Sequence, residues 1–474
     1  MFRLSLRLRW REVVVLLLSA GALASQLLLA GFIGLADNGD FPKVSMRLCI
    51  GAADDRAQAF RYFVSDYARG PAYCWDSGLK SSAIVPAWFA STLEQALGDP
   101  GKFDIRWLGV VNAALFLVFF CVLLIAIRPL EGWRWIAACI FALWIFTDVS
   151  FVAYFNSFFA DSAALLGGMI AAASALWLLA AGETRLLPVC VFAGGALLFV
   201  TSKSQHAIHG FVPALLLAML GYTAKKRVVR FTSWAAAGCV LAFGAWMVAG
   251  TPEWYKAQPR FNLIFSKIAK RSPATLDDFR ELGLGAPDLK YIGTNAFEPG
   301  NPTENEQWLA GFCRRTGYGK LLAYYVRHPA MMFGLIRDAL GPEGAGTRRP
   351  LSLSNFRRAE GKPAGAKTER FASWSRFREW LSGVWPAHVA AWYGLVLGGA
   401  AFALRRRRSR FDVALAAAAL GAAIVGLGEF SVAALADAIE TYRHLLLFQL
   451  FTDFTIFFAL VWALSAGAPR PGRV

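Results

Sequence analysis

The chain alternates between long apolar stretches and shorter polar connections. Ten of these stretches are about long enough to cross the hydrocarbon core of a bilayer as an α-helix. They lie at residues 13–35, 107–127, 133–151, 161–181, 186–202, 207–223, 231–250, 386–404, 411–436 and 443–466. The pattern predicts an all-α polytopic membrane protein with about ten transmembrane helices.

Basic residues gather in every second connection. They cluster at residues 3–11, 128–134, 185, 225–230, 405–410 and 470–473. Because cytoplasmic loops carry the excess of Lys and Arg, this spacing predicts that both termini are cytoplasmic and that the remaining connections lie outside. The first stretch also has features of a secretory signal, but its length and the spans that follow favour a retained helix.

The composition agrees with a membrane protein. Hydrophobic residues make up 57% of the 474 residues and charged residues only 17%, which excludes an ordinary soluble enzyme. The net charge of +17 is confined to clusters between apolar stretches. A nucleic-acid-binding protein would instead carry its basic residues on a soluble face, so a membrane is the expected partner and nucleic acid is not.

Two long connections fall on the predicted outer side, at residues 36–106 and 251–385. They divide the chain into a first membrane part (1–250, with the loop 36–106), an outer segment (251–385) and a last membrane part (386–474). In the first loop, residues 84–97 have helical periodicity with Trp88 and Phe89 on the apolar side, which predicts a helix in the membrane interface.

The outer segment is expected to be small and mainly helical. Helix-like stretches lie at residues 274–282, 304–317 and 319–340. The Gly-, Pro- and Arg-rich passage at residues 341–367 predicts a mobile loop.

The seven cysteines show no metal-binding spacing. Only Cys49 and Cys74 share an outer loop. In an oxidising compartment they would be able to pair, and two free thiols are an equal alternative.

Two carboxylates directly follow the first span. Asp37 and Asp40 belong to the sequence Asp-Asn-Gly-Asp-Phe at residues 37–41. Asn-Gly favours a solvated turn. At the rim of the membrane, however, either carboxylate could serve as a general base toward a lipid-borne substrate, and the pair could hold a divalent cation.

Further polar residues lie at other outer rims. Asp161 begins the fourth span. It is either a first-turn acid that interacts favourably with the helix dipole, or a further carboxylate of the same site. In the second case it would also be a ligand of the divalent cation. Lys203 precedes Gln205 and His206 between the fifth and sixth spans. Lys203 either reaches the outer headgroups or binds a phosphate together with these neighbours.

The last outer connection repeats this arrangement. Glu440 and Arg443 form either a structural ion pair or, with His444, part of a clamp for a donor phosphate. Glu429 and Asp453 lie inside apolar stretches, where ionisable groups are functional by default, and protonated packing residues are the alternative.

These motifs resemble those of a known class of enzymes. The sequences at residues 37–41, 154–161, 202–205 and 442–444 are similar to motifs of bacterial hexose transferases of cell-surface glycan biosynthesis, and so are residues 261–265 and 281–284 at the start of the outer segment. These enzymes are integral-membrane glycosyltransferases of the C-type (GT-C) fold. The resemblance extends over nearly the whole chain.

The resemblance implies a hexosyltransferase of the bacterial inner membrane with its active site on the outer face. The donor would be a hexose on polyprenyl phosphate, and the acceptor a cell-surface glycan or a lipid-linked molecule. Lys203 and Arg443 would bind the phosphate, and Asp37 or Asp40 would deprotonate the acceptor in a single inverting displacement. Asp161 and His444 would orient the acceptor or share a metal ion, and Asn262 is a candidate acceptor contact.

Two other classes of protein remain as alternatives. A flippase or transporter would use Glu429, Asp453 and Lys203 as a path through the membrane, although the two similar halves typical of transporters are not seen. A non-catalytic scaffold would bind a partner through the outer segment, but it would leave the polar clusters at the outer rim unexplained.

Overall fold

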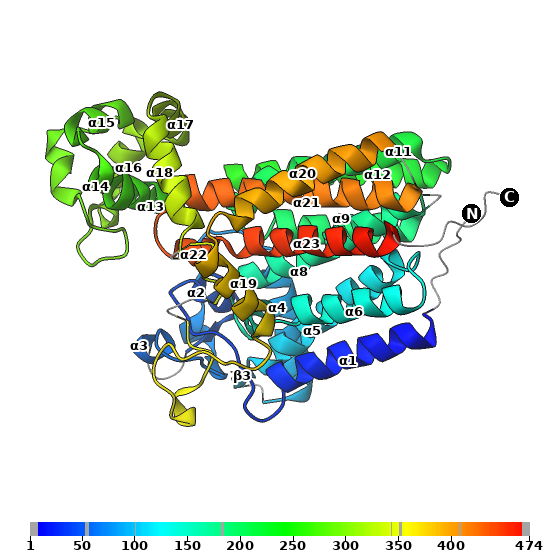
Figure 1. Ribbon diagram of the computed structural model, residues 1–474. Helices are drawn as coiled ribbons and strands as arrows, with labels where there is room; N and C mark the ends of the chain where they lie inside the picture. The colour runs from blue at the N-terminus through cyan, green and yellow to red at the C-terminus, as the bar shows by residue number, and fades with distance from the viewer. Residues whose placement is uncertain are drawn as a thin grey trace.

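The computed structural model describes residues 8–52, 56–99, 101–181, 184–342, 344–349, 353–406 and 409–466. Long helices run side by side, and a smaller helical body projects from one end of this bundle (Figure 1). The first helix begins and the last helix ends at the opposite end of the bundle (Figure 1). The predicted all-α polytopic class is therefore confirmed.

Every predicted span coincides with at least one helix. The bundle contains α1 (Trp10–Leu27), α5 (Arg106–Ala126), α6 (Trp133–Phe146), α8 (Asp161–Ala180), α9 (Leu186–Val200), α11 (Phe211–Thr223), α12 (Arg227–Ala249), α20 (His388–Arg406), α21 (Arg410–Leu435) and α23 (Leu446–Ala466). Within the described ranges, seven helices are long and apolar enough to cross a membrane, and two bent pairs raise this number to nine. The 15-residue α9 occupies the fifth predicted span, so the total of ten remains a prediction.

Two of the predicted spans are bent. The third breaks after Phe146, and the chain continues at 48° through α7 (Val149–Val152) and the short helix η3 (Ala153–Asn156). The eighth is joined to α19 (Ser373–Val384) at 104°. A bend of that size places α19 across the end of the bundle instead of along it.

The first span is shorter than predicted. Its helix ends at Leu27, and Gly31 adopts a φ of +74°, which favours glycine. Phe32, Ile33 and Leu35 are buried without being helical. The apolar stretch to residue 35 thus forms a helix first and then a non-helical segment that is buried in the bundle.

The first outer loop folds against the end of the bundle. Its elements are α2 (Pro42–Ser45), η1 (Met46–Leu48), α3 (Arg56–Ala59), η2 (Pro71–Tyr73), α4 (Ile84–Leu97) and the strands β1 (Ile50–Gly51), β2 (Asp66–Arg69) and β3 (Lys102–Asp104). The strands form an antiparallel sheet in the order β1-β2-β3. The predicted helix at residues 84–97 is confirmed, and its Trp88 and Phe89 are each 52% exposed. Its place in the membrane interface remains a prediction.

A disulfide bond closes part of this loop. Cys49 and Cys74 are bonded to each other, which decides between the two alternatives left open by the sequence.

The outer segment is helical and has its own apolar core. Its elements are α13 (Glu253–Asn262), the π-helix η5 (Leu263–Ile268), α14 (Ala269–Arg271), α15 (Thr275–Leu282), η6 (Ala286–Tyr291), η7 (Pro302–Glu304), α16 (Glu306–Arg315), α17 (Tyr318–Arg327) and α18 (Pro329–Leu340). Phe261, Phe265 and Phe312 lie in its core. The helix predicted at 319–340 is divided at His328, because the following Pro329 disfavours a helical conformation there.

The passage at 341–367 is anchored where the structure describes it, which contradicts the expectation of a mobile loop. It contains η8 (Arg358–Glu360). The guanidinium of Arg348 reaches into the bundle and bonds Asp453 in α23, with Nη2 2.5 Å from Oδ2. Arg378 in α19 bonds the other oxygen at 2.8 Å. Two arginines far away in sequence therefore compensate the charge of Asp453 inside its apolar stretch.

The basic clusters lie partly within the described chain. Arg128 bonds Glu12 of α1 through two nitrogens, with Nε 2.7 Å and Nη2 2.6 Å from the carboxylate oxygens. Glu12 lies in the first turn of α1, and α1 begins at the end of the bundle away from the outer segment (Figure 1), which agrees with the position that the charge pattern predicts for Arg128. The predicted cytoplasmic residues Arg3, Arg7, Arg407, Arg408, Arg470 and Arg473 lie outside the described residues.

Candidate active site

Asp40 follows the first span in a tight turn that Asp37 stabilises. Oδ1 of Asp37 accepts hydrogen bonds from the backbone N–H groups of Gly39 (2.8 Å) and Phe41 (3.1 Å). Gly39 has a φ of +98°, which this tight turn requires. Burial raises the pKa of Asp37, and the two N–H groups offset part of that rise. Asp37 therefore shapes the turn, and Asp40 is the carboxylate presented to other elements.

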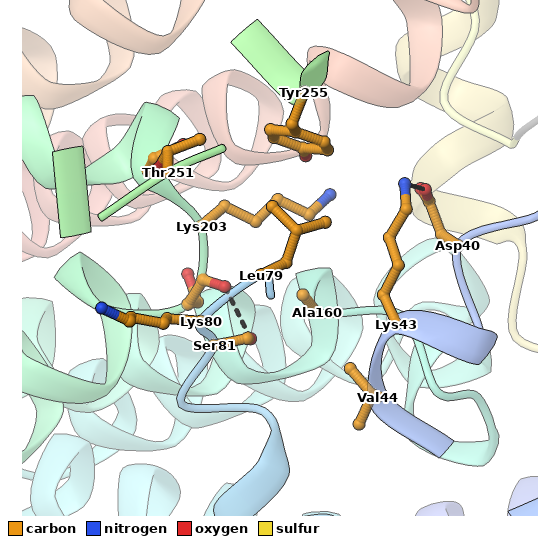
Figure 2. A pocket seen from close by; sticks show the side chains of 12 residues that line it. Asp40, Lys43, Val44, Leu79, Lys80, Ser81, Ala160, Lys203, Thr251 and Tyr255 are labelled. Atoms are coloured by element: carbon orange, nitrogen blue, oxygen red, sulfur yellow. Dashed lines mark hydrogen bonds and ion pairs between the residues drawn. The ribbon is translucent and has the colours of Figure 1, made fainter. Parts of the chain in front are cut away.

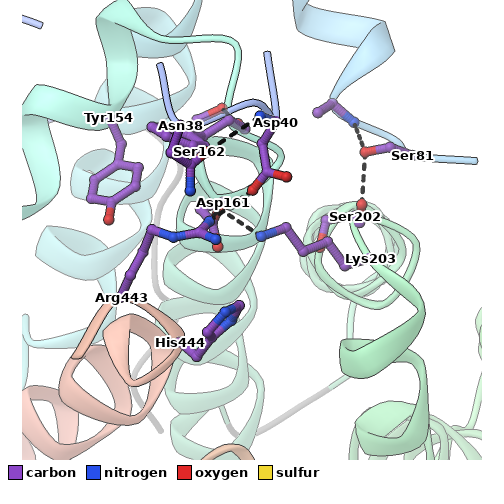
Figure 3. Close-up of polar contacts among 12 residues, drawn as sticks. Asn38, Asp40, Ser81, Tyr154, Asp161, Ser162, Ser202, Lys203, Arg443 and His444 are labelled. Atoms are coloured by element: carbon purple, nitrogen blue, oxygen red, sulfur yellow. Dashed lines mark hydrogen bonds and ion pairs between the residues drawn. The ribbon is translucent and has the colours of Figure 1, made fainter. Parts of the chain in front are cut away.

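Asp40 and Asp161 belong to a network of alternating charges (Figure 3). Nη1 of Arg443 lies 2.9 Å from Oδ2 of Asp40 and 3.7 Å from Oδ2 of Asp161. Nζ of Lys203 donates to Oδ2 of Asp161 at 2.7 Å. Lys43 forms an ion pair with Asp40 from the other side. The structure thus brings together four of the predicted site residues.

Several elements distant in sequence build this network. Asp161 is the first residue of α8, Lys203 immediately precedes α10 (Ser204–Ala207), and Arg443 lies in α22 (Thr441–His444). Their side chains converge although they come from different helices (Figure 3). Polar side chains at the ends of spans can meet in this way without being buried in the apolar interior.

Arg443 is held by a second carboxylate. Its Nε lies 2.9 Å from Oε2 of Glu440, and Asn38 donates to the same oxygen at 2.8 Å. The pair with Glu440 and the contact with Asp40 coexist, so the structural ion pair predicted for the last outer connection does not exclude a role of Arg443 in the site. Glu440 has a φ of +52°, a conformation that costs free energy for a residue with a side chain.

The cations control the protonation of Asp40. Burial alone would raise the pKa of this carboxyl, but Arg443, Lys43 and Lys203 outweigh burial and hold the pKa well below its usual value. Burial would also lower the pKa of Lys43, yet Asp40 raises it above the ordinary value. Both groups are therefore charged at neutral pH, and the side chain of Asp40 is still 21% exposed.

His444 lies beside Lys203 and Arg443 (Figure 3). Its Nε2 lies 3.3 Å from Oδ2 of Asp437. Burial lowers the pKa of His444, and Arg443 lowers it further, whereas Asp437 opposes the shift. A neutral imidazole is thus expected near pH 7.

A cavity opens next to the charge network (Figure 2). It encloses about 480 Å³, including space open to solvent, and its lining includes Asp40, Lys43, Lys80, Lys203 and Tyr255. Lys43 and Lys203 point toward Asp40, whereas Lys80 points the other way (Figure 2). A cavity with several ammonium groups and one carboxylate is suited to an anionic ligand that also carries a group able to donate a proton.

The sequence was compared with known proteins. Residues 5–470 match the model of the YfdI N-terminal transmembrane domain. The chain belongs to this family. Neither a search of curated proteins nor a search of solved structures gave a match. Membership of a transmembrane-domain family agrees with the helical bundle and with a polytopic membrane protein.

The residues of this family member do not fit the divalent cation considered for Asp37, Asp40 and Asp161. Asp37 uses Oδ1 in its own turn, and the other two carboxylates are paired with cationic side chains. Throughout the part of the chain that the structure describes, no three His, Cys, Asp or Glu side chains form a metal-binding group. No catalytic step is therefore assigned to a metal ion.

Other predicted residues lie apart from the charge network. His206 is 1% exposed and contacts Glu429, with Nδ1 2.7 Å from Oε1. Asn262 is buried in the outer segment, where its Oδ1 accepts the N–H of Ala296 at 2.7 Å. Gln205 is partly buried on α10, next to His206. Both residues therefore have contacts within the protein, and their contacts with substrate stay a prediction.

Lys43 and Tyr255 are among the lining residues that sequence reasoning missed. Lys43 follows Asp40 by three residues, a spacing that lets its side chain reach back from α2 to Asp40 just before that helix. Tyr255 lies on α13, and the ammonium of Lys43 is 5.1 Å from the centre of its ring. The spacing from Asp40 was a usable signal for Lys43, whereas Tyr255 reaches the site only through the folding of the outer segment.

Proposed function

We propose that this chain is a membrane glycosyltransferase that transfers a hexose from a polyprenyl-phosphate donor to a glycan or lipid-linked acceptor. The observation that carries the proposal is the position of Asp40 on a cavity that Lys43 and Lys203 also line. An ionised carboxylate next to phosphate-binding cations is what such a transfer requires. The family match and the resemblance of the motifs support the same reaction class.

The proposed reaction is a single displacement. The acceptor hydroxyl oxygen attacks the anomeric carbon, the bond between that carbon and the phosphate oxygen breaks, and the hydroxyl proton passes to Asp40. Polyprenyl phosphate leaves with the bonding electron pair. Lys203 and Arg443 stabilise the negative charge that develops on the phosphate, and attack from the opposite side inverts the anomeric centre.

Donor binding would also activate the base. In the free protein Arg443 and Lys43 pair with Asp40 and make it a weak base. A phosphate that draws these cations away from Asp40 raises the affinity of Asp40 for a proton. Asp40 would therefore become an effective base only when the donor is present.

The outer side of a bacterial inner membrane is the proposed location of the site. Disulfide bonds persist in oxidising compartments, and the loop that carries Asp40 contains the Cys49–Cys74 bond. The spacing of the basic clusters leads to the same orientation.

The geometry does not favour the flippase alternative. Asp453 is bound by Arg348 and Arg378, and Glu429 is bound by His206. Carboxylates held in this way do not form an open path with Lys203.

The test compares transfer by wild type, Asp40→Asn and Asp37→Asn in membranes that contain equal amounts of protein. The substrates are labelled polyprenyl-phosphate hexose and a pool of lipid-linked glycans. We expect transfer by Asp40→Asn to fall about a hundredfold or more, the loss typical of a missing general base. Asp37→Asn is the matched control, because its amide oxygen still accepts the N–H groups of Gly39 and Phe41. Full activity of Asp40→Asn would contradict the proposed base, and no transfer by wild type from any hexose donor would contradict the function.

A further inference from the structure

A second cluster of ionisable groups lies inside the bundle, away from the cavity. Glu429, in the last two turns of α21, contacts two imidazoles through one oxygen. Nδ1 of His206 lies 2.7 Å and Nε2 of His209 lies 3.2 Å from Oε1 of Glu429. All three side chains are at most 3% exposed, and none of them lines the cavity.

The two histidines belong to the segment that carries Lys203. Between α9 and α11 the chain forms only the four-residue α10 and the three-residue η4 (Ile208–Gly210). We call residues 201–210 the lysine turn. These two short helices continue without a break into α11, so that Ser204–Thr223 forms one 20-residue helical span. The first backbone N–H groups of a helix have no partner within it, so contacts with other elements help to fix this end of the span and the position of Lys203 before it.

Two elements hold the lysine turn from opposite ends. On the outer side Ser81 donates to the carbonyl of Ser202 at 2.6 Å (Figure 3). On the inner side Glu429 holds His206, whose backbone N–H donates to the carbonyl of Lys203 at 3.1 Å. Fixing the ring of His206 therefore fixes the backbone from which Lys203 reaches Asp161.

The packing around the histidines is tight. Phe199 stacks on both imidazoles, with an angle of 22° between its ring plane and each of theirs. A Cβ atom at Gly428 would lie 2.4 Å from Cε1 of His209, so only glycine allows this approach of α21. The imidazoles thus have one position, set by Phe199 on one side and by Gly428 and Glu429 on the other.

We infer that Glu429, His206 and His209 are positioning residues for Lys203. They hold the lysine turn so that its ammonium group faces the donor phosphate, and the inference rests on the proposed function of the cavity. A carboxylate within a span is costly, and buried polar groups of this kind are known to fix the register of packed helices. The class of ligand served is the phosphate of the lipid-linked donor.

Four variants test this inference. Glu429→Leu removes the acceptor oxygen, and Gly428→Ala displaces His209 without a change of charge. Glu429→Gln retains an oxygen that can accept from Nδ1 of His206. Gly421→Ala on the same helix is the matched control, because nothing lies within 4 Å of the added Cβ.

Hydrogen–deuterium exchange of the full-length protein reports on the lysine turn without any ligand. We expect faster exchange in residues 201–210 for Glu429→Leu and Gly428→Ala, and no change for Gly421→Ala. Should Glu429→Leu fail to fold, Gly428→Ala still decides the question. Unchanged exchange in Gly428→Ala would overturn the inference, whether or not the protein transfers sugar.

The second readout is the donor KM in the transfer assay. We expect Gly428→Ala and Glu429→Leu to raise it about tenfold, as for one misplaced charge-assisted hydrogen bond, with a smaller effect in Glu429→Gln. In a Lys203→Ala background the same substitutions are expected to add little, because the group that they position is gone. Equal effects with and without Lys203 would overturn the positioning role. Absence of transfer by wild type would instead refute the proposed function, and the exchange data would still decide whether the cluster holds the turn.

Discussion

At the scale of single residues, the environment of Asp40 separates it from Asp37 only three positions away. Asp37 is committed to backbone N–H groups of its own turn, and Asp40 contacts Arg443 and Lys43. An aspartate thus has a local structural role at position 37, whereas an aspartate at position 40 contacts two cationic side chains.

The lowered pKa of Asp40 predicts how stability depends on pH. Because the folded protein favours the charged carboxylate, the stability contributed by Asp40 is complete above its unfolded pKa of about 4 and is lost as the pH falls below that value. We expect wild type to melt at a higher temperature than Asp40→Asn between pH 5 and pH 8. The difference should shrink below about pH 4, because the unfolded chain then binds a proton at this carboxyl that the folded protein does not bind.

Thermal unfolding in detergent, followed at several pH values for both proteins, measures this difference. A gap that closes between pH 7 and pH 5 would show that the cations do not lower the pKa of Asp40. Asp37→Asn serves as the control for loss of a carboxylate in the same turn.

The sequence was informative about residues at the ends of spans and less so about their partners. Charged groups next to apolar spans are costly unless a partner or a function compensates them. On this ground the sequence singles out Asp40, Asp161, Lys203 and Arg443. The contact of His206 with Glu429 could not be predicted, because the two residues lie 223 positions apart and nothing local connects them. Which of Asp37 and Asp40 faces the other elements depends on two backbone hydrogen bonds, which composition and spacing do not reveal.

At the scale of secondary-structure elements, periodicity predicted the helices well and their interruptions poorly. Residues 84–97 form a helix with the predicted bounds, because an apolar side and a following Gly98 define it. Breaks that depend on single residues, such as His328 before Pro329 or Gly31 after α1, changed the length of predicted helices. The passage 341–367 looked mobile because Gly and Pro are frequent in it. Its described residues nevertheless bond distant segments, as Arg348 does with Asp453 and Asn355 does with the carbonyl of Gly34.

The first outer loop depends on its disulfide bond. We expect five thiols to react in the unfolded, unreduced protein, namely Cys121, Cys139, Cys190, Cys239 and Cys313, and seven after reduction. Cys49→Ser should lower the free energy of unfolding by about 3 kcal/mol, as expected for a loop of this length.

Mass spectrometry after alkylation counts the thiols, and thermal unfolding measures the stability. Cys313→Ser provides the control, since it removes one thiol and leaves the loop intact. Seven reactive thiols without reduction would contradict the disulfide.

At the scale of the whole molecule, one end of the bundle carries both the outer segment and the first outer loop (Figure 1). The charge pattern of the short connections predicts that this end lies on the outer side of the membrane. That prediction depends on many basic residues and not on a single contact. The fold class was therefore predictable from sequence, while the arrangement of the two outer parts around the cavity was not.

The orientation can be tested by limited proteolysis. Trypsin added outside spheroplasts should cut within residues 251–385, where residues such as Arg280, with 67% of its side chain exposed, are accessible. In inverted vesicles trypsin should instead cut at the junction of α11 and α12, where Lys225, Lys226 and Arg227 are exposed. The opposite pattern of fragments would reverse the predicted orientation and place the cavity in the cytoplasm.

The buried contact of Asp453 with Arg348 and Arg378 also constrains how the protein is made. An aspartate within a span costs about 2.5–3.5 kcal/mol when the helix enters the membrane alone. Both arginines are synthesised before α23 and lie on the outer side of the predicted topology. The two positive charges that compensate Asp453 are therefore already present when α23 enters the bilayer. The insertion of α23 is thus coupled to the prior folding of the segment that precedes α20.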